Sequence, residues 1–256
     1  MRHTPTATVS RKPLAGIAAF ALAVALTGTA NAQSTQKHLT LTSISSATVA
    51  PHGMGFVGLS YTTNRAANVT DSDGSAVVGI GIGSAEDSIG LQFTANITSL
   101  TDDFADSGFL SVKASRQIAA GRNPTYASLE IGQLANWGDA DGIRETATIA
   151  VTRFSQWNLG ASQEQYPVMM TIGAGTNLRN SNSDPGVFAG IGIGLSEYTA
   201  ASVAWAGESV SIGGGFKIKG ADNLVISLSL DDAFDQVDRQ RLTLSVGYRF
   251  SNLFGG

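Results

Sequence analysis

Cysteine is absent from all 256 residues, and this absence excludes several classes of protein. The chain can form no disulfide, no thiolate metal site and no lipid-modified N-terminal cysteine. Histidine is also scarce, with only His3, His38 and His52, all near the start. Hydrolytic sites of the Ser–His or Asp–His kind need an imidazole as general base. Because all three histidines precede the alternating segments described below, we predict no enzyme and no catalytic residue. We also expect no metal and no cofactor.

Long apolar runs are absent as well, except for one near the N-terminus. Leu14–Leu26 follows a basic leader, and the small residues Ala30–Ala32 come shortly after it. This layout is typical of a secretory signal peptide. A run of about 13 apolar residues is too short for a helix that spans the ~30 Å hydrocarbon core. We therefore predict that residues 1–32 are a signal peptide and that Gln33 begins the exported chain.

The exported part is acidic. All 20 acidic residues follow Ala32 and only 13 of the 16 basic ones do, which gives a net charge of −7. This balance argues against non-specific binding to nucleic acid or to anionic lipid. The rest of the chain contains no linker-like composition break, so we expect a single large domain.

Alternation between apolar and polar residues dominates the exported chain. In residues 88–97, for example, Ile89, Leu91 and Phe93 share one face, and Gly90 and Gln92 share the other. This period of two is typical of strands with two different faces. Segments of this kind lie near 55–63, 76–83, 88–98, 108–118, 125–134, 145–154, 167–175, 186–195, 199–206, 209–218, 223–230 and 241–250.

The connections between these segments alternate in length. Most odd-numbered connections are long and rich in Asp and Asn, whereas most even-numbered ones are short turns; residues 155–166 and 207–208 fit least well. Long outer loops alternating with short periplasmic turns are typical of outer-membrane barrels, and a soluble sandwich has no reason to show this parity. We predict an all-β fold over residues 53–250: a transmembrane, antiparallel, up-and-down β-barrel of about 12 strands.

The last segment carries a family resemblance. Its outward residues resemble the β-signal of the Gram-negative outer-membrane β-barrel superfamily, and they are Leu242, Leu244, Val246, Tyr248 and Phe250. The resemblance implies recognition by the barrel-assembly machinery and residence in the cell outer membrane, in contact with lipid and lipopolysaccharide. One departure is the short C-terminal extension 251–256, because the usual final aromatic is the last residue.

Small residues, mostly Gly, Ser and Thr, fill the other face of nearly every segment. A barrel of twelve strands lined in this way leaves space that the wall itself does not fill, which favours a water-filled passage. A flattened barrel, or a lumen plugged by the periplasmic or lumenal segment 33–52, remains an alternative. That segment could also be disordered or add a strand at Leu39–Ile44.

Four charged residues stand on the inward face: Lys113, Glu130, Lys217 and Arg249. Three positive charges against one negative charge would bias a pore weakly toward anions. Lys113 and Glu130 lie nearly symmetrically about the connection 119–124, so they are candidate cross-strand partners. In that case they could form a structural ion pair without a role in transport.

The predicted outer loops hold most of the acidic residues. Residues 71–74 and 139–142 both read Asp-x-Asp-Gly, but each lacks further ligands of a Ca²⁺ loop, and turn chemistry explains the pattern without a metal. The sequence therefore predicts a small porin-like passive channel for small hydrophilic solutes, with a weak anion preference. The alternative is a non-conducting structural or adhesive surface barrel that binds a partner through its acidic outer loops.

Overall fold

The computed structural model describes residues 37–63, 72–100, 104–160, 164–180 and 182–254. The predicted signal peptide, residues 1–32, lies outside the described residues. Twelve strands form the fold: β1 Gly55–Thr62, β2 Asp73–Gly83, β3 Gly90–Ile97, β4 Gly108–Ala119, β5 Thr125–Trp137, β6 Thr146–Asn158, β7 Gln165–Arg179, β8 Asp184–Gly194, β9 Thr199–Ala206, β10 Val210–Lys217, β11 Leu224–Asp231 and β12 Arg241–Phe250. One 3-10 turn, η1, covers Gly138–Ala140. Within the described ranges no helix is long and apolar enough to cross a membrane.

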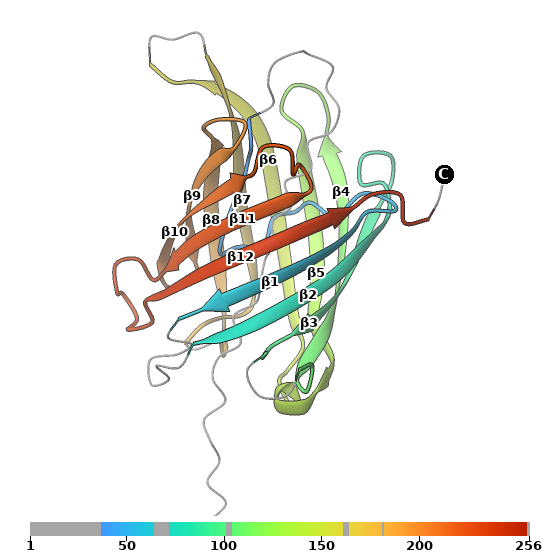
Figure 1. The fold of residues 1–256 in the computed structure, drawn as a ribbon, viewed down its shortest axis with the longest axis vertical. Coiled ribbons are helices and arrows are strands. Elements are labelled where there is room, and N and C mark those ends of the chain that lie inside the picture. Colours follow the sequence, from blue (N-terminus) through green and yellow to red (C-terminus); the bar gives the residue numbers. More distant parts are fainter. Residues whose placement is uncertain (1–36, 64–71, 101–103, 161–163, 181, 255–256) are drawn as a thin grey trace, which may run out of the picture.

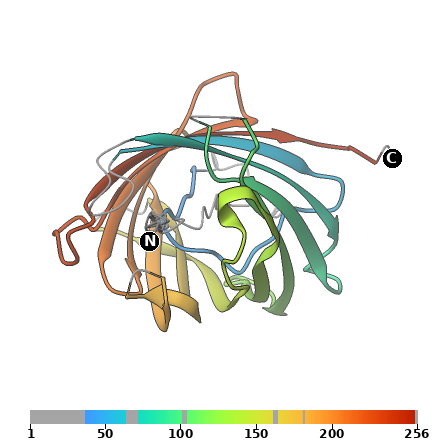
Figure 2. The same ribbon diagram turned by 90° about the horizontal axis from the view of Figure 1, so that it is seen from below.

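Each strand pairs antiparallel with its neighbours in sequence, and β1 pairs with β12 (Figures 1 and 2). The ring is therefore closed, with Gly55 opposite Phe250 and Thr62 opposite Thr243 at the seam. Closure leaves no unpaired sheet edge, which a sandwich would retain. The predicted fold class, an up-and-down barrel of twelve strands, is confirmed.

The period of two places large apolar side chains outside and small ones inside. On β12, Leu244 is 46% exposed, whereas its neighbours Thr243 and Ser245 are buried. Every strand has such outward residues, which we call the outer belt and represent by Leu59, Val78, Phe93, Leu110, Leu129, Ile149, Ile172, Val187, Val203, Ile212, Leu228 and Leu244. The belt surrounds the whole barrel, because each of these residues lies on a different strand.

The wall is longest at β5, β6 and β7, which have 13, 13 and 15 residues, against 8 in β1, β3 and β9 to β11. The connection predicted at 155–166 is shorter than expected, because Trp157 pairs with Tyr166 and extends both strands. Polar residues such as Ser155 and Gln156 interrupt the alternation there. The sequence pattern therefore ends several residues before the backbone hydrogen bonds between β6 and β7 do.

Two rims follow from the connections. Among the described residues, the turn rim carries 84–89, 120–124, 159–160, 164, 195–198 and 218–223, and it is where β1 begins and β12 ends. The loop rim carries the odd-numbered connections, several of which are longer. The expected parity of loop lengths holds except at 180–183 and 207–209, where β7 and β8 extend into the predicted loop and β9 and β10 are joined by a tight turn.

Candidate functional site

Residues 37–50, which precede the first strand, lie inside the barrel (Figure 2). These residues, which we call the lumenal segment, have no regular secondary structure, and most of them are buried. Leu41 is 1% exposed and Ala47 is 0% exposed. Of the arrangements left open by the sequence, the structure has the one in which this segment occupies the lumen. The additional strand at Leu39–Ile44 is not formed.

The lumenal segment enters and leaves by the same rim. The His38 N–H donates to the Ser196 carbonyl at the turn rim, over 2.7 Å. The segment then reaches toward the loop rim, where the Ser43 hydroxyl donates to Asp231 at the end of β11. After this point it returns, and the Gly53 N–H donates to the Gly81 carbonyl on β2 over 3.0 Å. The path is an inverted U, and Ser43 adopts a left-handed φ of 68° at its bend.

The first arm of the U packs against glycines of β8 and β10 and against small residues of β9 between them, a surface we call the glycine wall. A Cβ atom on Gly192 would lie 1.9 Å from the Thr40 carbonyl oxygen, and one on Gly213 would lie 2.1 Å from the Thr42 hydroxyl. Only glycine permits this approach of the segment to the wall. The small residues leave space as the sequence predicts, but part of that space is filled by the chain itself.

Apolar side chains complete the contact with the glycine wall. Leu39, Leu41 and Ile44 form a buried cluster with the inward residues Met169 and Phe188. Burying an aliphatic side chain stabilises by about 1.5–3 kcal/mol, so this cluster is a substantial anchor. The hydroxyls of Thr42 and Ser202 add a hydrogen bond of 2.9 Å between segment and wall.

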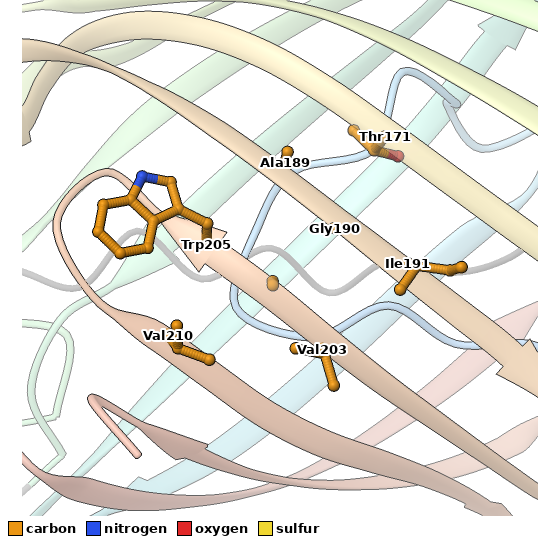
Figure 3. A pocket seen from close by; sticks show the side chains of 8 residues that line it. Thr171, Ala189, Gly190, Ile191, Val203, Trp205 and Val210 are labelled. Carbon is orange, nitrogen blue, oxygen red and sulfur yellow. The ribbon is translucent and has the colours of Figure 1, made fainter. Parts of the chain in front are cut away.

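The outer side of the glycine wall is apolar. A shallow hollow of about 350 Å³ lies there, bordered by Ile191, Val203, Trp205 and Val210 (Figure 3). Ile191, Val203 and Trp205 belong to the outward-facing, exposed set. The hollow is bordered mainly by outward-facing residues, and the inward-facing Thr171 and Ala204 also line it.

The second arm of the U is held by polar side chains of β3 to β6, a surface we call the polar wall. Lys113 on β4 lies opposite Glu130 on β5, and their side chains form an ion pair of 3.0 Å. They are the cross-strand neighbours that their symmetry about the connection 119–124 predicts. The Ser45 hydroxyl joins both: it accepts from Lys113 Nζ over 2.6 Å and donates to Glu130 Oε2 over 2.9 Å.

Backbone groups of the second arm are satisfied by the same wall. The Ala47 N–H donates to the Thr152 hydroxyl over 2.7 Å, and the Ala47 carbonyl accepts from the Ser115 hydroxyl over 2.5 Å. The Ala50 N–H donates to Gln92 Oε1 over 2.9 Å. A segment without secondary structure must find such partners when it is buried, because an unpaired buried peptide group is costly.

The other two predicted lumen charges lie apart from this pair, near the turn rim. Arg249 Nη2 donates to the Asp222 carbonyl over 2.7 Å, and Lys217 stands at the end of β10. His38 is their neighbour from the lumenal segment. Burial, and then the positive charges of Lys217 and Arg249, lower the pKa of His38 to about 4. Sequence reasoning set His38 aside, because alternation assigns inward positions only to wall strands.

The proposed assembly residues lie on the outward face of β12, which pairs with both β11 and β1. The extension after Phe250 folds back over the turn rim. There the Leu253 N–H donates to the Gly53 carbonyl over 2.9 Å, and the rings of Phe254 and His52 lie 5.2 Å apart. The role of these strand residues in assembly stays a prediction.

The acidic loops are only partly described, since residues 64–71 and 101–103 lie outside the described residues. Asp232 is 1% exposed, and its carboxylate accepts backbone N–H groups from Gln236, Val237 and Arg239. Burial by itself would raise the pKa of Asp232. The three hydrogen bonds and the positive charge of Arg239 outweigh that effect and lower the pKa. Turn chemistry thus accounts for this residue. In the part of the chain that the structure describes, no group of three potential ligands could hold a metal ion.

Comparison with known proteins gives likeness of fold only. No family model and no curated protein matches the chain. A KdgM porin in complex with disordered oligogalacturonate is similar with a TM-score of 0.49 and 9% identity, over 77% of this chain and 98% of that one. Omp33 of Acinetobacter baumannii has a TM-score of 0.43 and 11% identity, over 78% and 98%. An outer membrane channel from Pseudomonas putida F1 has a TM-score of 0.42 and 13% identity, over 79% and 97%. Likenesses this distant say nothing of solute or partner.

Proposed function

We propose that the protein is an outer-membrane β-barrel channel of the porin type, with a weak anion preference and a passage narrowed by its own lumenal segment. The observation that carries this proposal is the outer belt around a closed barrel whose inner wall is small and polar. Soluble monomers rarely expose contiguous apolar patches larger than a few hundred Å². The apolar belt includes residues of all twelve strands, so something apolar must shield it from water around the whole barrel. A surrounding lipid bilayer does this.

Two arginines fit this placement. Arg116 and Arg153 are exposed on outward faces, and both lie toward the turn rim, where Arg153 is level with the first residue of β5. An arginine there can extend into the interface, where it costs about 0–1 kcal/mol instead of ~2–4 kcal/mol at the midplane. The turn rim is then the periplasmic side, and the acidic loop rim faces lipopolysaccharide. Insertion by the barrel-assembly machinery, guided by β12, is part of the same proposal.

The charges inside the barrel support a weak anion preference. Lys113 is neutralised by Glu130, so this pair contributes little net field. Lys217 and Arg249 stand near the turn rim, with Asp222 as the acidic group that acts on both. A small excess of positive charge at one mouth attracts anions and is screened beyond ~8–10 Å at ordinary salt.

The second candidate is a barrel that does not conduct and serves as a structural or adhesive surface protein. One specific observation favours it: the lumenal segment contacts both the glycine wall and the polar wall, so it crosses the lumen. The two candidates differ in whether that segment moves.

A disulfide lock separates the two candidates. Thr42→Cys with Ser202→Cys places the only two cysteines of the chain where two hydroxyl oxygens now lie 2.9 Å apart. In planar bilayers we expect the oxidised protein to stay in a low-conductance state and the reduced protein to open to a larger one. Both should prefer anions weakly in dilute salt. The single variant Ser202→Cys should not respond to reductant.

If correctly folded protein conducts in neither redox state, the channel is excluded and the non-conducting barrel remains. Equal conductance in both states would mean that the current bypasses the lumenal segment. Folding is checked in each sample by the heat-modifiable gel mobility of closed barrels.

A further inference from the structure

Three basic side chains meet where the lumenal segment passes the turn rim. Lys217 is the last residue of β10 and Arg249 lies near the end of β12, on the inward faces shared with Gly215 and Gly247. Lys217 and Gly247 both lie at the level of Val225 on the strand between them, so Lys217 and Arg249 are diagonal neighbours across β11. His38 of the lumenal segment lies over Gly215, one inward position from Lys217.

These groups have hydrogen-bonding capacity that the protein does not use. His38 is 6% exposed, and its Nε2 atom is buried without a hydrogen-bond partner among the described residues. Arg249 Nε is likewise buried without one. Such orphaned buried atoms are rare in native proteins and call for an explanation. The Lys217 ammonium has no hydrogen bond or ion pair within the described part of the chain.

The charge at this place is also unbalanced. Asp222 is the acidic residue that acts on Lys217 and Arg249. Two other carboxylates at this rim are engaged elsewhere: Glu164 binds Lys37 over 2.6 Å and accepts from the Tyr166 hydroxyl, and Glu197 interacts with Tyr198. Two permanent cations and one titratable imidazole therefore face one available carboxylate. A bound anion would supply both the missing acceptor atoms and the missing negative charge.

We propose that His38, Lys217 and Arg249 form a binding site for a small oxyanion, a carboxylate or phosphate group, between the lumenal segment and the wall at the turn rim. Each residue donates from a nitrogen that now lacks a partner: Nε2 of His38, Nζ of Lys217 and Nε of Arg249. As a solute site it rests on the proposed channel function, which it deepens by naming the solute class. As a binding site it does not need conduction.

Binding of the anion is coupled to a proton. Without an anion His38 is neutral at pH 7, since burial and the two neighbouring cations hold its pKa at about 4. An oxyanion beside Nε2 favours the imidazolium form, so binding raises the pKa of His38 and takes up a proton. The anion also joins the lumenal segment to β10 and β12, so it should keep the segment in the lumen.

Nuclear magnetic resonance of the two histidines that follow residue 32 provides the test. The refolded protein in detergent micelles, labelled at histidine and held at constant ionic strength, is titrated with pH in the absence and presence of inorganic phosphate. We expect phosphate to move the pKa of His38 upward toward 6.5 and to leave His52 unchanged. His52 is an internal reference, because its Nδ1 accepts from the Gly83 N–H on β2, which is two strands from Arg249 and four strands from Lys217 around the barrel.

Variants decide whether the effect belongs to this site. Lys217→Gln and Arg249→Gln should each reduce the phosphate effect on His38 at least severalfold, while the exposed Lys219→Gln should leave it intact. The proposal is overturned if phosphate moves neither histidine, if it moves both equally, or if the effect survives Lys217→Gln together with Arg249→Gln. Acetate in place of phosphate tests whether a carboxylate binds as well. Conductance is a separate readout: phosphate binding without conduction keeps the site and rejects the channel, and conduction without phosphate binding does the reverse.

Discussion

The glycine wall and the polar wall hold the two arms of one segment by different means. At β8 and β10 the segment lies against bare backbone, and a Cβ on Gly192 or Gly194 would collide with it. At β3 to β6 it is held by separate polar bonds, such as those from Ser115 and Thr152. Adding even one atom to a closely packed contact forces the segment and the wall apart. Removing one hydrogen bond from a set of several costs only about 0.5–1.5 kcal/mol of stability. We therefore expect the glycine wall to be less tolerant of substitution than the polar wall.

Release of the lumenal segment can be followed with one reporter. Ser46→Cys introduces the only thiol of the chain at a position that is 4% exposed. A charged maleimide should label this thiol only when the segment leaves the lumen. The following predictions use the labelling rate of the reporter in refolded protein, from the largest expected change to the smallest.

Gly192→Val should break the glycine wall. The added side chain would overlap the Thr40 carbonyl, and overpacking of this kind costs about 1–3 kcal/mol or more. We expect labelling of the reporter thiol to become roughly a hundredfold faster while the barrel stays heat-modifiable, because ~1.4 kcal/mol corresponds to a factor of ten. The control is Gly214→Val on the outward face of β10, where a Cβ would lie 3.2 Å from its nearest neighbour. Equal labelling in the two variants would contradict the distinction between the faces.

Acid should loosen the first arm through His38. Its pKa is about 4 in the folded protein and 6.5 when it is exposed, so the released segment binds the extra proton. The contribution of His38 is complete above pH 6.5 and is lost as the pH falls toward 4. Allowing for solvent screening at the rim, we expect labelling of the reporter, measured relative to an exposed thiol at the same pH, to rise about tenfold from pH 7 to pH 5. His38→Gln should remove this dependence, and a rise that persists in that variant would assign it to another group.

Lys113→Met should weaken the polar wall by a smaller amount. The change removes the ammonium that Ser45 and Glu130 share, but the Glu130 side chain is 29% exposed and can recover water. We expect a cost of about 1 kcal/mol and labelling roughly fivefold faster. Lys219→Met, an exposed lysine at the turn rim, is the matched control. A larger effect than that of Gly192→Val would reverse the comparison of the two walls.

Much of the fold was predictable, because the information is local. A period of two marks a strand and assigns each residue to a face, as in Leu242, Leu244 and Val246. Short connections then pair each strand with the next, so even the register of Lys113 and Glu130 follows from their distance to one turn. Strand ends such as Trp157 with Tyr166 were missed, since ladder hydrogen bonds continue there without the alternation.

The candidate site was predictable only in half. Its wall residues, Lys217 and Arg249, lie in strands with alternating apolar and polar residues, and this alternation predicts that they face inward. His38 lies outside any alternating segment, so no pattern assigns it to a face. Its neighbours in space are about 180 and 210 residues away in the chain, and sequence patterns do not predict pairing over such distances.

By itself, then, the sequence determined the alternating strands, their order around the barrel and the small size of the inward residues. Only the tertiary structure decided what fills the space that those residues leave. The Ala47 to Thr152 and Thr42 to Ser202 bonds join residues 105 and 160 positions apart. Contacts of this kind depend on the closed barrel, because only the closed wall brings glycines and hydroxyls to the places where an irregular backbone can lie close and satisfy its buried N–H and C=O groups.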